Sequence, residues 1–515
     1  MNKLSAVFGT ATVATLVWAT ACGNATAPKT PVVPTAASAS AVPAAVVDPL
    51  GDRPALQPGK QVEIQAPTVF KSPNGLTVWL VERHALPLVA VTVALPAGSS
   101  SDPPDRLGLA AITASMLDEG AGKLDAIALS NALNDLGASI AVDTRLDASF
   151  VSLTILKANF AKGFQLLSDV VARPRFAEKD WKRVAGLWID GLQQRSDDPD
   201  EVARVVVGAA LYGARTAYGH PANGYMDDAK RTRLRDVKAF HERNWRADQG
   251  VIVVVGDVTR PEVEAAVNDG FSSWKPKNGS APDVIPAASL VPAAKRPRLV
   301  LVDRADAPQS VISVVRDGIT ASDSDAPGLD LVNTALGGSF TSRLNQNLRE
   351  DKHWTYGAFS RFSRTRGQGS FIASAAVFAE VTGKALGEML GELKKMTDTG
   401  LSPDELAKSK AQDLGDLIQI YETAGGTCQR LAALRMLGLD AQFDAAASKE
   451  RQASTIAGAA ALARAHVNAA TATIVVVGPR DKVLPQLVDA GLGEPEIWGP
   501  DGVPAAPAKP PHAHD

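Results

Sequence analysis

Two stretches of the chain share one order of hydrophobic and polar positions. Residues 75–98 and residues 298–318 each contain two alternating patterns around a proline-containing turn. Residues 250–267 and 472–488 each contain a continuous apolar run, a glycine turn and a helical pattern. Alternation is typical of half-buried strands, and a short apolar run before glycine is typical of a fully buried strand. The sequence therefore predicts two copies of one α+β unit.

Apolar residues at helical spacing fill the middle of each copy. In the first copy, alternation over residues 140–155 is followed by a helical stripe from Phe160 to Val171, and residues 386–396 repeat this stripe in the second copy. A further apolar helix face is marked by Trp181, Val184, Leu187, Trp188 and Leu192. We expect these aromatic and methionine side chains to pack in the cores rather than to contact a cofactor.

Changes in composition set the expected domain boundaries. We expect a first domain over residues 62–275 and a second over 298–499, each with an antiparallel-rich sheet and helices on one face, together forming a bowl-like half of a clamshell. Residues 276–297 are rich in Pro, Ala and Lys without periodicity, which predicts a linker. Residues 23–61 and 500–515 are dominated by Ala and Pro, and we expect both to be disordered.

The first 22 residues have the pattern of an export signal. Lys3 precedes an apolar run that ends at Trp18 and is too short to span a bilayer permanently, and small residues follow up to Cys22. Small residues before a cysteine resemble a bacterial lipobox, which predicts lipidation of Cys22 and a place on the periplasmic side of the cell envelope. Gly23 does not resemble an inner-membrane retention signal, which favours the outer membrane. The alternative is an ordinary cleaved signal with a chance cysteine.

Composition and charge limit the kinds of partner that the chain can bind and the covalent cross-links that it can form. The chain has 515 residues, a net charge of -3 and a pI near 6.2. The sequence contains no basic patch of the kind that binds nucleic acid, so it gives no indication of a nucleic-acid partner. Cys428 is the only thiol besides Cys22, so the mature monomer can form no internal disulfide. The seven histidines are scattered, and none in the body of the chain has the spacing of a metal motif.

Candidate chemistry lies in residues 336–357, where Arg349 and Tyr356 are seven positions apart. At ~100° per residue, seven steps place both side chains on nearly the same helix face if the helix persists that far. A guanidinium group and a phenol aimed at one place can hold a peptide carbonyl and stabilise the oxyanion formed during hydrolysis. The alternative, which these two residues alone favour, is that Arg349 pairs with an acid and Tyr356 is partly buried.

The duplicated α+β halves and the long linker resemble the insulinase and mitochondrial-processing-peptidase family of zinc metallopeptidases. In that family the first half carries an H-x-x-E-H helix that binds zinc and supplies the general base. In this chain the matching positions are Ala111, Ala114 and Ser115, none of which can perform these roles. The family's third ligand would fall within residues 190–192, where only Asp190 could coordinate a metal. The resemblance therefore implies a degenerate metal site and no cofactor on this chain.

The second half keeps a different part of the family pattern. A typical run reads S-R-L-x-Q-x-x-R-E-x-K-x-x-x-Y, and the matching residues here are Ser342, Arg343, Leu344, Gln346, Arg349, Glu350, Lys352 and Tyr356. The resemblance implies that Arg349 and Tyr356 hold the substrate and stabilise the transition state. Residues 219–224 also resemble the family's His-Pro loop.

Some bacterial members of the family divide the active site between two chains. We therefore expect this chain to be the non-metal subunit of a periplasmic heterodimeric zinc peptidase that cleaves extended peptides. Zinc and H-x-x-E-H would belong to a homologous partner, and this chain would be inactive alone. One alternative is a peptide-binding chaperone or scaffold subunit of a membrane-anchored complex. The weakest alternative is an autonomous peptidase with unconventional metal ligands.

Overall fold

The computed structural model describes residues 63–274, 290–292, 295–296 and 298–505, all within one compact unit, Gly59–Asp515. We call residues 63–274 the first half and residues 298–505 the second half. Cys22, the expected signal peptide and the expected tether lie outside the described residues, as do most of the linker and the end of the tail. Within the described ranges, no helix is both long enough and apolar enough to cross a bilayer.

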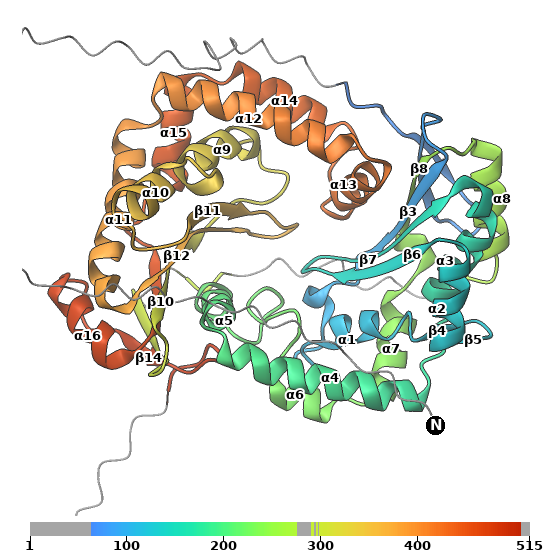
Figure 1. Cartoon of the computed structure of the whole chain (residues 1–515), viewed down its shortest axis with the longest axis horizontal. Coiled ribbons are helices and arrows are strands. Elements are labelled where there is room, and N and C mark those ends of the chain that lie inside the picture. The colour runs from blue at the N-terminus through green and yellow to red at the C-terminus, as the bar shows by residue number, and fades with distance from the viewer. Residues whose placement is uncertain (1–62, 275–289, 293–294, 297, 506–515) are drawn as a thin grey trace, which may run out of the picture. The chain divides into compact units, whose positions relative to one another are not determined.

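The first half is built on a six-stranded sheet with the order β1-β2-β8-β3-β7-β6 (Figure 1). Strand β8 pairs in parallel with β2 and antiparallel with β3, so the two strands predicted around the first proline turn are not neighbours. The strands are β1 (Thr68–Lys71), β2 (Thr77–Glu82), β3 (Leu88–Leu95), β6 (Ser139–Thr144), β7 (Ser149–Leu156) and β8 (Val251–Gly256).

The second sheet repeats this topology, with the order β11-β12-β10-β13-β9-β14. Strand β13 lies between β9 and β10, parallel to the first and antiparallel to the second, as β8 does between β2 and β3. The strands are β9 (Leu299–Asp303), β10 (Gln309–Asp317), β11 (Ala358–Ser363), β12 (Ser370–Phe378), β13 (Thr473–Gly478) and β14 (Glu496–Trp498). The two sheets differ in their sixth strand, because β1 precedes its sheet in the chain and β14 follows its own. The predicted α+β class with two sheet-and-helix units is confirmed.

Helices of the first half cover one face of its sheet and enclose a core that includes Phe164, Leu167 and Trp181. The helical elements are η1 (Ser99–Ser101), α1 (Leu109–Ser115), α2 (Ala126–Asp135), η2 (Lys157–Asn159), α3 (Phe160–Ala172), α4 (Glu178–Asp197), α5 (Pro199–Tyr212), α6 (Met226–Arg231), α7 (Leu234–Asn244), η3 (Ala247–Gln249) and α8 (Arg260–Phe271). A short ribbon, β4 (Gly120–Ala121) and β5 (Leu124–Asp125), lies between α1 and α2 in the chain.

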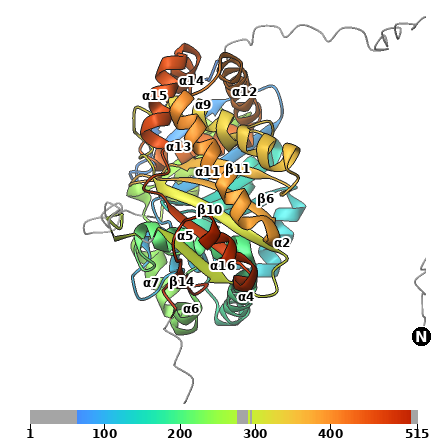
Figure 2. The ribbon, with the colours of Figure 1, turned by 90° about the vertical axis from the view of Figure 1, so that its left-hand side faces the viewer.

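The second half has its own core, which includes the predicted stripe residues Leu386, Met389 and Leu393. Figure 2 views this half from the side of α11 and α16, with β10 behind them. The helical elements are α9 (Ala326–Asn333), η5 (Thr334–Gly338), α10 (Arg343–Asn345), η6 (Gln346–Asp351), η7 (Ala379–Val381), α11 (Thr382–Thr399), α12 (Pro403–Tyr421), α13 (Ala424–Met436), α14 (Phe443–Ala453), α15 (Ile456–His466) and α16 (Arg480–Asp489).

Each sheet also has a helix from the other half on its second face, in addition to the expected helices on one face. Helix α13 packs on β3 and β8 of the first sheet, where the Cys428 thiol contacts the Val253 carbonyl oxygen at 3.1 Å. Helix α5 packs on β10 and β13 of the second sheet. Because both faces of each sheet are covered by helices, β8 and β13 are buried along their whole length. Their sequences are therefore continuous apolar runs rather than alternating ones.

Candidate functional site

The three positions that match the family's metal motif lie on α1. Ala111 and Ser115 line a cavity of about 370 Å³. The Ser115 hydroxyl donates a hydrogen bond to the Ala111 carbonyl oxygen at 3.1 Å, so its proton already has an acceptor within α1. Ala114 is 3% exposed and does not line the cavity. The position of the family's general base is therefore enclosed by protein.

Helix α4 forms the opposite wall of this cavity, through Leu187, Trp188, Gly191 and Leu192. The prediction that the α4 stripe is core is wrong for Leu187, whose side chain is 59% exposed, because the small residues of α1 leave space in front of it. The Trp188 indole N–H donates to the Asn223 carbonyl oxygen at 2.9 Å. Asp190 is exposed and does not line the cavity.

The residues around this cavity do not fit a zinc ion. Zinc in a peptidase requires three nitrogen, oxygen or sulfur ligands from the protein. Glu119 and Arg183 are the ionisable residues that line the cavity, and they form an ion pair with each other. Across the described part of the chain, no group of three or more His, Cys, Asp or Glu residues is arranged to hold a metal.

The start of α1 is nevertheless held in place by hydrogen bonds to a buried carboxylate, that of Asp102. The Asp102 carboxylate accepts hydrogen bonds from the Gly108 N–H at 2.7 Å and the Ala110 N–H at 2.6 Å, at the start of α1. It also contacts His220 Nε2 at 3.2 Å, and neither side chain is exposed. Burial raises the pKa of Asp102. His220 comes from the loop that resembles the His-Pro loop, so this buried contact ties that loop to the start of α1.

Gly108 shows how closely α1 and this loop approach each other. Its φ is 93°, in the left-handed region that favours glycine. A Cβ atom at this position would lie 2.6 Å from the Asn223 carbonyl oxygen, which is too close for any side chain. Glycine at position 108 is therefore required by the packing of α1 against residues 219–224.

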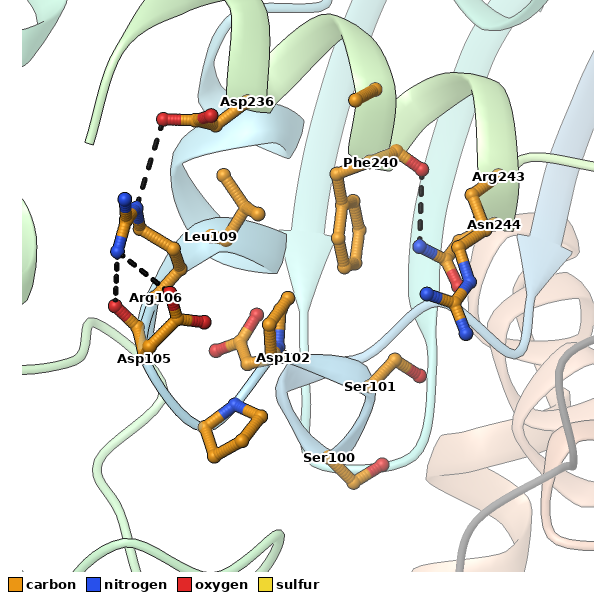
Figure 3. A pocket seen from close by; sticks show the side chains of 13 residues that line it. Ser100, Ser101, Asp102, Asp105, Arg106, Leu109, Asp236, Phe240, Arg243 and Asn244 are labelled. Carbon is orange, nitrogen blue, oxygen red and sulfur yellow. Dashed lines mark hydrogen bonds and ion pairs between the residues drawn. The ribbon is translucent and has the colours of Figure 1, made fainter.

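A second cavity, of about 690 Å³, is lined by Asp102 and lies between residues 100–109 and α7 (Figure 3). Arg106 crosses one end of it, 2.9 Å from the Asp105 carboxylate and 3.7 Å from Asp236 of α7. The Asn244 amide at the other end donates to the Phe240 carbonyl oxygen at 3.1 Å. Of these contacts, the one between Arg106 and Asp236 joins the loop to α7.

In the second half, Arg349 lies on η6, which ends at Asp351. His353 follows with a φ of 57°, a left-handed conformation that turns the chain out of the helix. Tyr356 therefore does not lie on the helix of Arg349, and the prediction of one shared helix face is wrong because the helix stops five residues before Tyr356.

The surroundings of these two side chains differ from those of core residues. The Arg349 guanidinium lies over the Phe340 ring, 4.2 Å from its centroid, and its Nε is 3.6 Å from a Glu350 carboxylate oxygen. Tyr356 is 86% exposed, and no described residue forms a hydrogen bond with its hydroxyl. The exposure of Tyr356 contradicts the alternative in which it is partly buried. Both polar groups are available to a ligand.

The helix that carries Arg349 is anchored at its start by Arg343. The Arg343 guanidinium binds both carboxylate oxygens of Glu405, at 2.6 and 2.7 Å, and the Gly400 carbonyl oxygen at 2.7 Å. Burial raises the pKa of Glu405, but its hydrogen bonds with Arg343 and with the Ser402 N–H outweigh this effect, so the pKa lies below its ordinary value. Sequence reasoning placed Arg343 in the family pattern without assigning it this structural role, because its partner is 62 residues away.

The fold and the cavity on α1 define a metallopeptidase-type scaffold without its metal ligands. Residues 77–217 match the family profile described as insulinase (peptidase family M16), and residues 233–412 match the profile described as peptidase M16 inactive domain. The chain belongs to peptidase family M16.

Individual relatives agree with this assignment. An uncharacterized zinc protease of Mycobacterium tuberculosis is 24% identical over 73% of this chain and 85% of that protein. The non-peptidase homolog YmxG of Helicobacter pylori is 22% identical over 78% of this chain and 91% of that protein. The crystal structure of a peptidase M16 inactive domain from Pseudomonas fluorescens superposes with a TM-score of 0.74 and 25% identity, covering 81% of this chain and 98% of that one.

Proposed function

We propose that this chain is the non-metal-binding subunit of a two-chain zinc peptidase. In this proposal a homologous partner with H-x-x-E-H supplies zinc and the general base, while this chain supplies substrate binding and transition-state stabilisation. The observation that carries the proposal is the contrast between the cavity on α1, which has no metal ligands, and the exposed, unbonded hydroxyl of Tyr356.

Arg349 and Tyr356 have complementary chemical roles in this proposal. The planar Arg349 guanidinium can donate two parallel hydrogen bonds to a substrate carbonyl or carboxylate. The Tyr356 hydroxyl can donate to the oxyanion that develops when water attacks the peptide carbonyl. Because Arg349 rests on Phe340 rather than in a bidentate ion pair, its N–H groups need not leave a strong partner to reach a substrate.

The substrate is an extended peptide, since a peptide that adds as a strand to a sheet edge is recognised through its backbone. Lipidation at Cys22 would hold the chain on the periplasmic side of the bacterial envelope. The partner would meet its substrate in the same compartment.

A second candidate function is a peptide-binding chaperone or a scaffold in a membrane-anchored complex. It is favoured by the similarity of the chain to the non-peptidase homolog YmxG of Helicobacter pylori. A scaffold has no chemical need for Tyr356, so the two functions predict different effects of changing this residue.

The test is to combine the chain with an H-x-x-E-H relative from the same organism and to measure cleavage of extended fluorogenic peptides. We expect activity only in the mixture. Tyr356→Phe and Arg349→Ala should each lower kcat/KM by about 100-fold in an intact complex, because each removes a group that contacts the transition state. The anchor is tested separately, because Cys22→Ser should release the chain from the membrane fraction.

Arg464→Ala is the matched control for Arg349→Ala. Arg464 lies on α15 of the same half, is exposed and has no ion-pair partner among the described residues, so its loss should leave kcat/KM unchanged. If Tyr356→Phe and Arg349→Ala behave like this control while the complex stays intact, the catalytic role is wrong and the scaffold is favoured.

A further inference from the structure

We propose that the cavity between α1 and α4 binds an uncharged, apolar side chain of an extended peptide. The family's metal centre has been converted into a side-chain pocket at the same position. This inference rests on the proposed function only in that the ligand is a peptide, and it concerns binding rather than cleavage.

Space for a side chain comes from three small residues that face one cavity from two helices. Ala111 and Ser115 lie one turn apart on α1, and Gly191 lies on α4. A Cβ atom at Gly191 would meet no heavy atom within 4 Å, so the space beside it is open. The cavity of about 370 Å³ falls within the usual range for ligand sites, which begins near 300 Å³.

The chemistry of the walls selects a neutral, apolar group. Ile112, Val184, Leu187 and Trp188 supply apolar surface. The charges of Glu119 and Arg183 offset each other in their ion pair, so the cavity carries no net charge to complement a charged side chain. The Ser115 hydroxyl and the Trp188 N–H both already have protein acceptors. A charged side chain would have to displace one member of the Glu119–Arg183 ion pair to gain a partner there.

The neighbouring strand indicates why the ligand is a peptide. Helix α1 packs against β6, which is an edge strand that pairs only with β7 among the described strands. Ile140 and Val142 of β6 pack against the same core as α1. A peptide that added to the free edge of β6 would present alternate side chains on this face, beside the cavity.

The experiment measures binding of two labelled peptides to the full chain alone by fluorescence anisotropy. Both peptides are unstructured Ser-, Thr- and Gly-rich decamers, and they differ only in a central Phe or Ala. We expect the Phe peptide to bind about tenfold more tightly or better, because a buried Phe side chain leaves water and an Ala side chain leaves the cavity unfilled.

Gly191→Leu fills the cavity from α4 and should abolish the preference for Phe. Gly186→Leu is the matched control, because Gly186 is an exposed residue of the same helix, also has no atom within 4 Å of a Cβ, and does not line the cavity. The control should keep the preference. Both substitutions replace glycine by leucine within a helix, which raises helix propensity.

Three outcomes overturn the pocket: an unchanged preference in Gly191→Leu, equal binding of the two peptides to the wild-type chain, or no binding at about 1 mM peptide, an affinity too weak for a pocket. Sedimentation tests a second copy of the chain as the occupant. If Gly191→Leu changes the mass of the wild-type species, the cavity is an interface between copies and the peptide assignment is wrong. The pocket and the proposed function fail separately, because cleavage in the mixture depends on Tyr356 and peptide preference of the lone chain depends on Gly191.

Discussion

The α1 region of the first half and the η6 region of the second half have similar frameworks but opposite chemistry. Each helical segment is fixed at its start by a carboxylate, which is Asp102 for α1 and Glu405, through Arg343, for the segment that carries Arg349. On α1 the positions expected to act on a substrate are small and unreactive. In the η6 region they are Arg349, which lies on η6 and is 33% exposed, and Tyr356, which follows η6 and is 86% exposed.

This difference shows that the stability of the fold and the chemistry of the site rest on different residues. The framework residues Asp102, His220 and Arg343 are largely buried and hydrogen-bonded, so their loss would leave buried partners unsatisfied. Tyr356 has no such partner, and an exposed side chain of this kind contributes little to folding. The loss of its hydroxyl should therefore leave the fold intact, and the ligand role proposed for it can be tested without unfolding the chain.

The largest expected effect comes from giving α1 the metal ligands that it lacks. Ala111→His, Ser115→His and Gly191→Glu together place three ligands around one cavity. We expect the affinity for Co²⁺ to rise by about 1000-fold or more over the wild-type chain, because three protein ligands suffice for a tetrahedral site with an open position.

The d–d absorption of Co²⁺ during titration measures this change and reports tetrahedral geometry. The control is the pair Ala111→His and Ser115→His without Gly191→Glu, which should bind more weakly. Equal and weak Co²⁺ binding by the wild-type chain, the two-residue variant and the three-residue variant would show that α1 and α4 do not retain the geometry of a metal site.

The next effect tests the framework of the first half. Asp102→Ala removes the acceptor of two N–H groups at the start of α1 and the partner of His220, so it should lower the free energy of unfolding by ~3 kcal/mol. Urea denaturation measures this value. Asp105→Ala is the control, because its side chain is 73% exposed, and it should change stability by less than ~0.5 kcal/mol. Similar values for both variants would contradict the role assigned to Asp102.

A smaller, pH-dependent effect tests the framework of the second half. The folded chain holds Glu405 ionised to a lower pH than the unfolded chain does, because its pKa is lowered. The stabilisation that the ionised Glu405 carboxylate contributes is therefore fully present above the pKa of Glu in the unfolded chain, about 4.3. It is lost as the pH falls through the lower pKa of Glu405 in the folded chain. Glu405→Gln should destabilise the chain by about 1 kcal/mol at neutral pH.

Denaturation at a series of pH values tests the sign of this effect. The difference between wild type and Glu405→Gln should shrink as the pH falls from about 6 to about 3, across the usual range of Glu titration. Glu494→Gln, at an exposed residue without an ion-pair partner among the described residues, should show no such trend. A difference that grows on acidification would reverse the assignment.

The smallest expected effect concerns Phe340, the ring beneath Arg349. Phe340→Leu keeps an apolar side chain but removes the cation–π contact, which is worth about 0.5–1 kcal/mol at an exposed site. In the two-chain assay we expect a two- to fivefold loss of kcat/KM, carried mainly by KM, which corresponds to about that energy. Phe378→Leu, at another partly exposed phenylalanine of the same half, should have no effect.

Much of the fold could be predicted because it depends on local patterns. The alternation in β6 and β7, the apolar stripes of α3 and α11, and the repeated strand–glycine–helix endings all follow from the period of hydrophobic residues. The order of strands could not be predicted, because β8 inserts between β2 and β3 after more than 150 residues of intervening chain. No local pattern records such a pairing.

The candidate site was predicted in part. The loss of metal ligands at Ala111, Ala114 and Ser115 follows from residue identity, since no arrangement gives an alanine a ligand atom. The placement of Tyr356 was not predictable, because a left-handed turn at His353 ends the helical direction. The sequence offered no glycine there to mark the turn. The cavity on α1 was also missed, because Leu187 and Trp188 fit a core stripe until the small residues opposite them are known.

The sequence by itself determined that the chain has two related α+β halves and that the first half lacks the ligands of its family's metal centre, because these properties depend on residue type and spacing. Only the tertiary structure decided what took the place of that centre. It brought Gly191 of α4 opposite Ala111 and Ser115 of α1 to leave an open cavity, and it left Tyr356 exposed beyond the end of η6. The cavity depends on contacts between segments distant in the chain, and the exposure of Tyr356 follows a left-handed turn at His353, a residue that is not glycine. No pattern of hydrophobic and polar residues records either outcome.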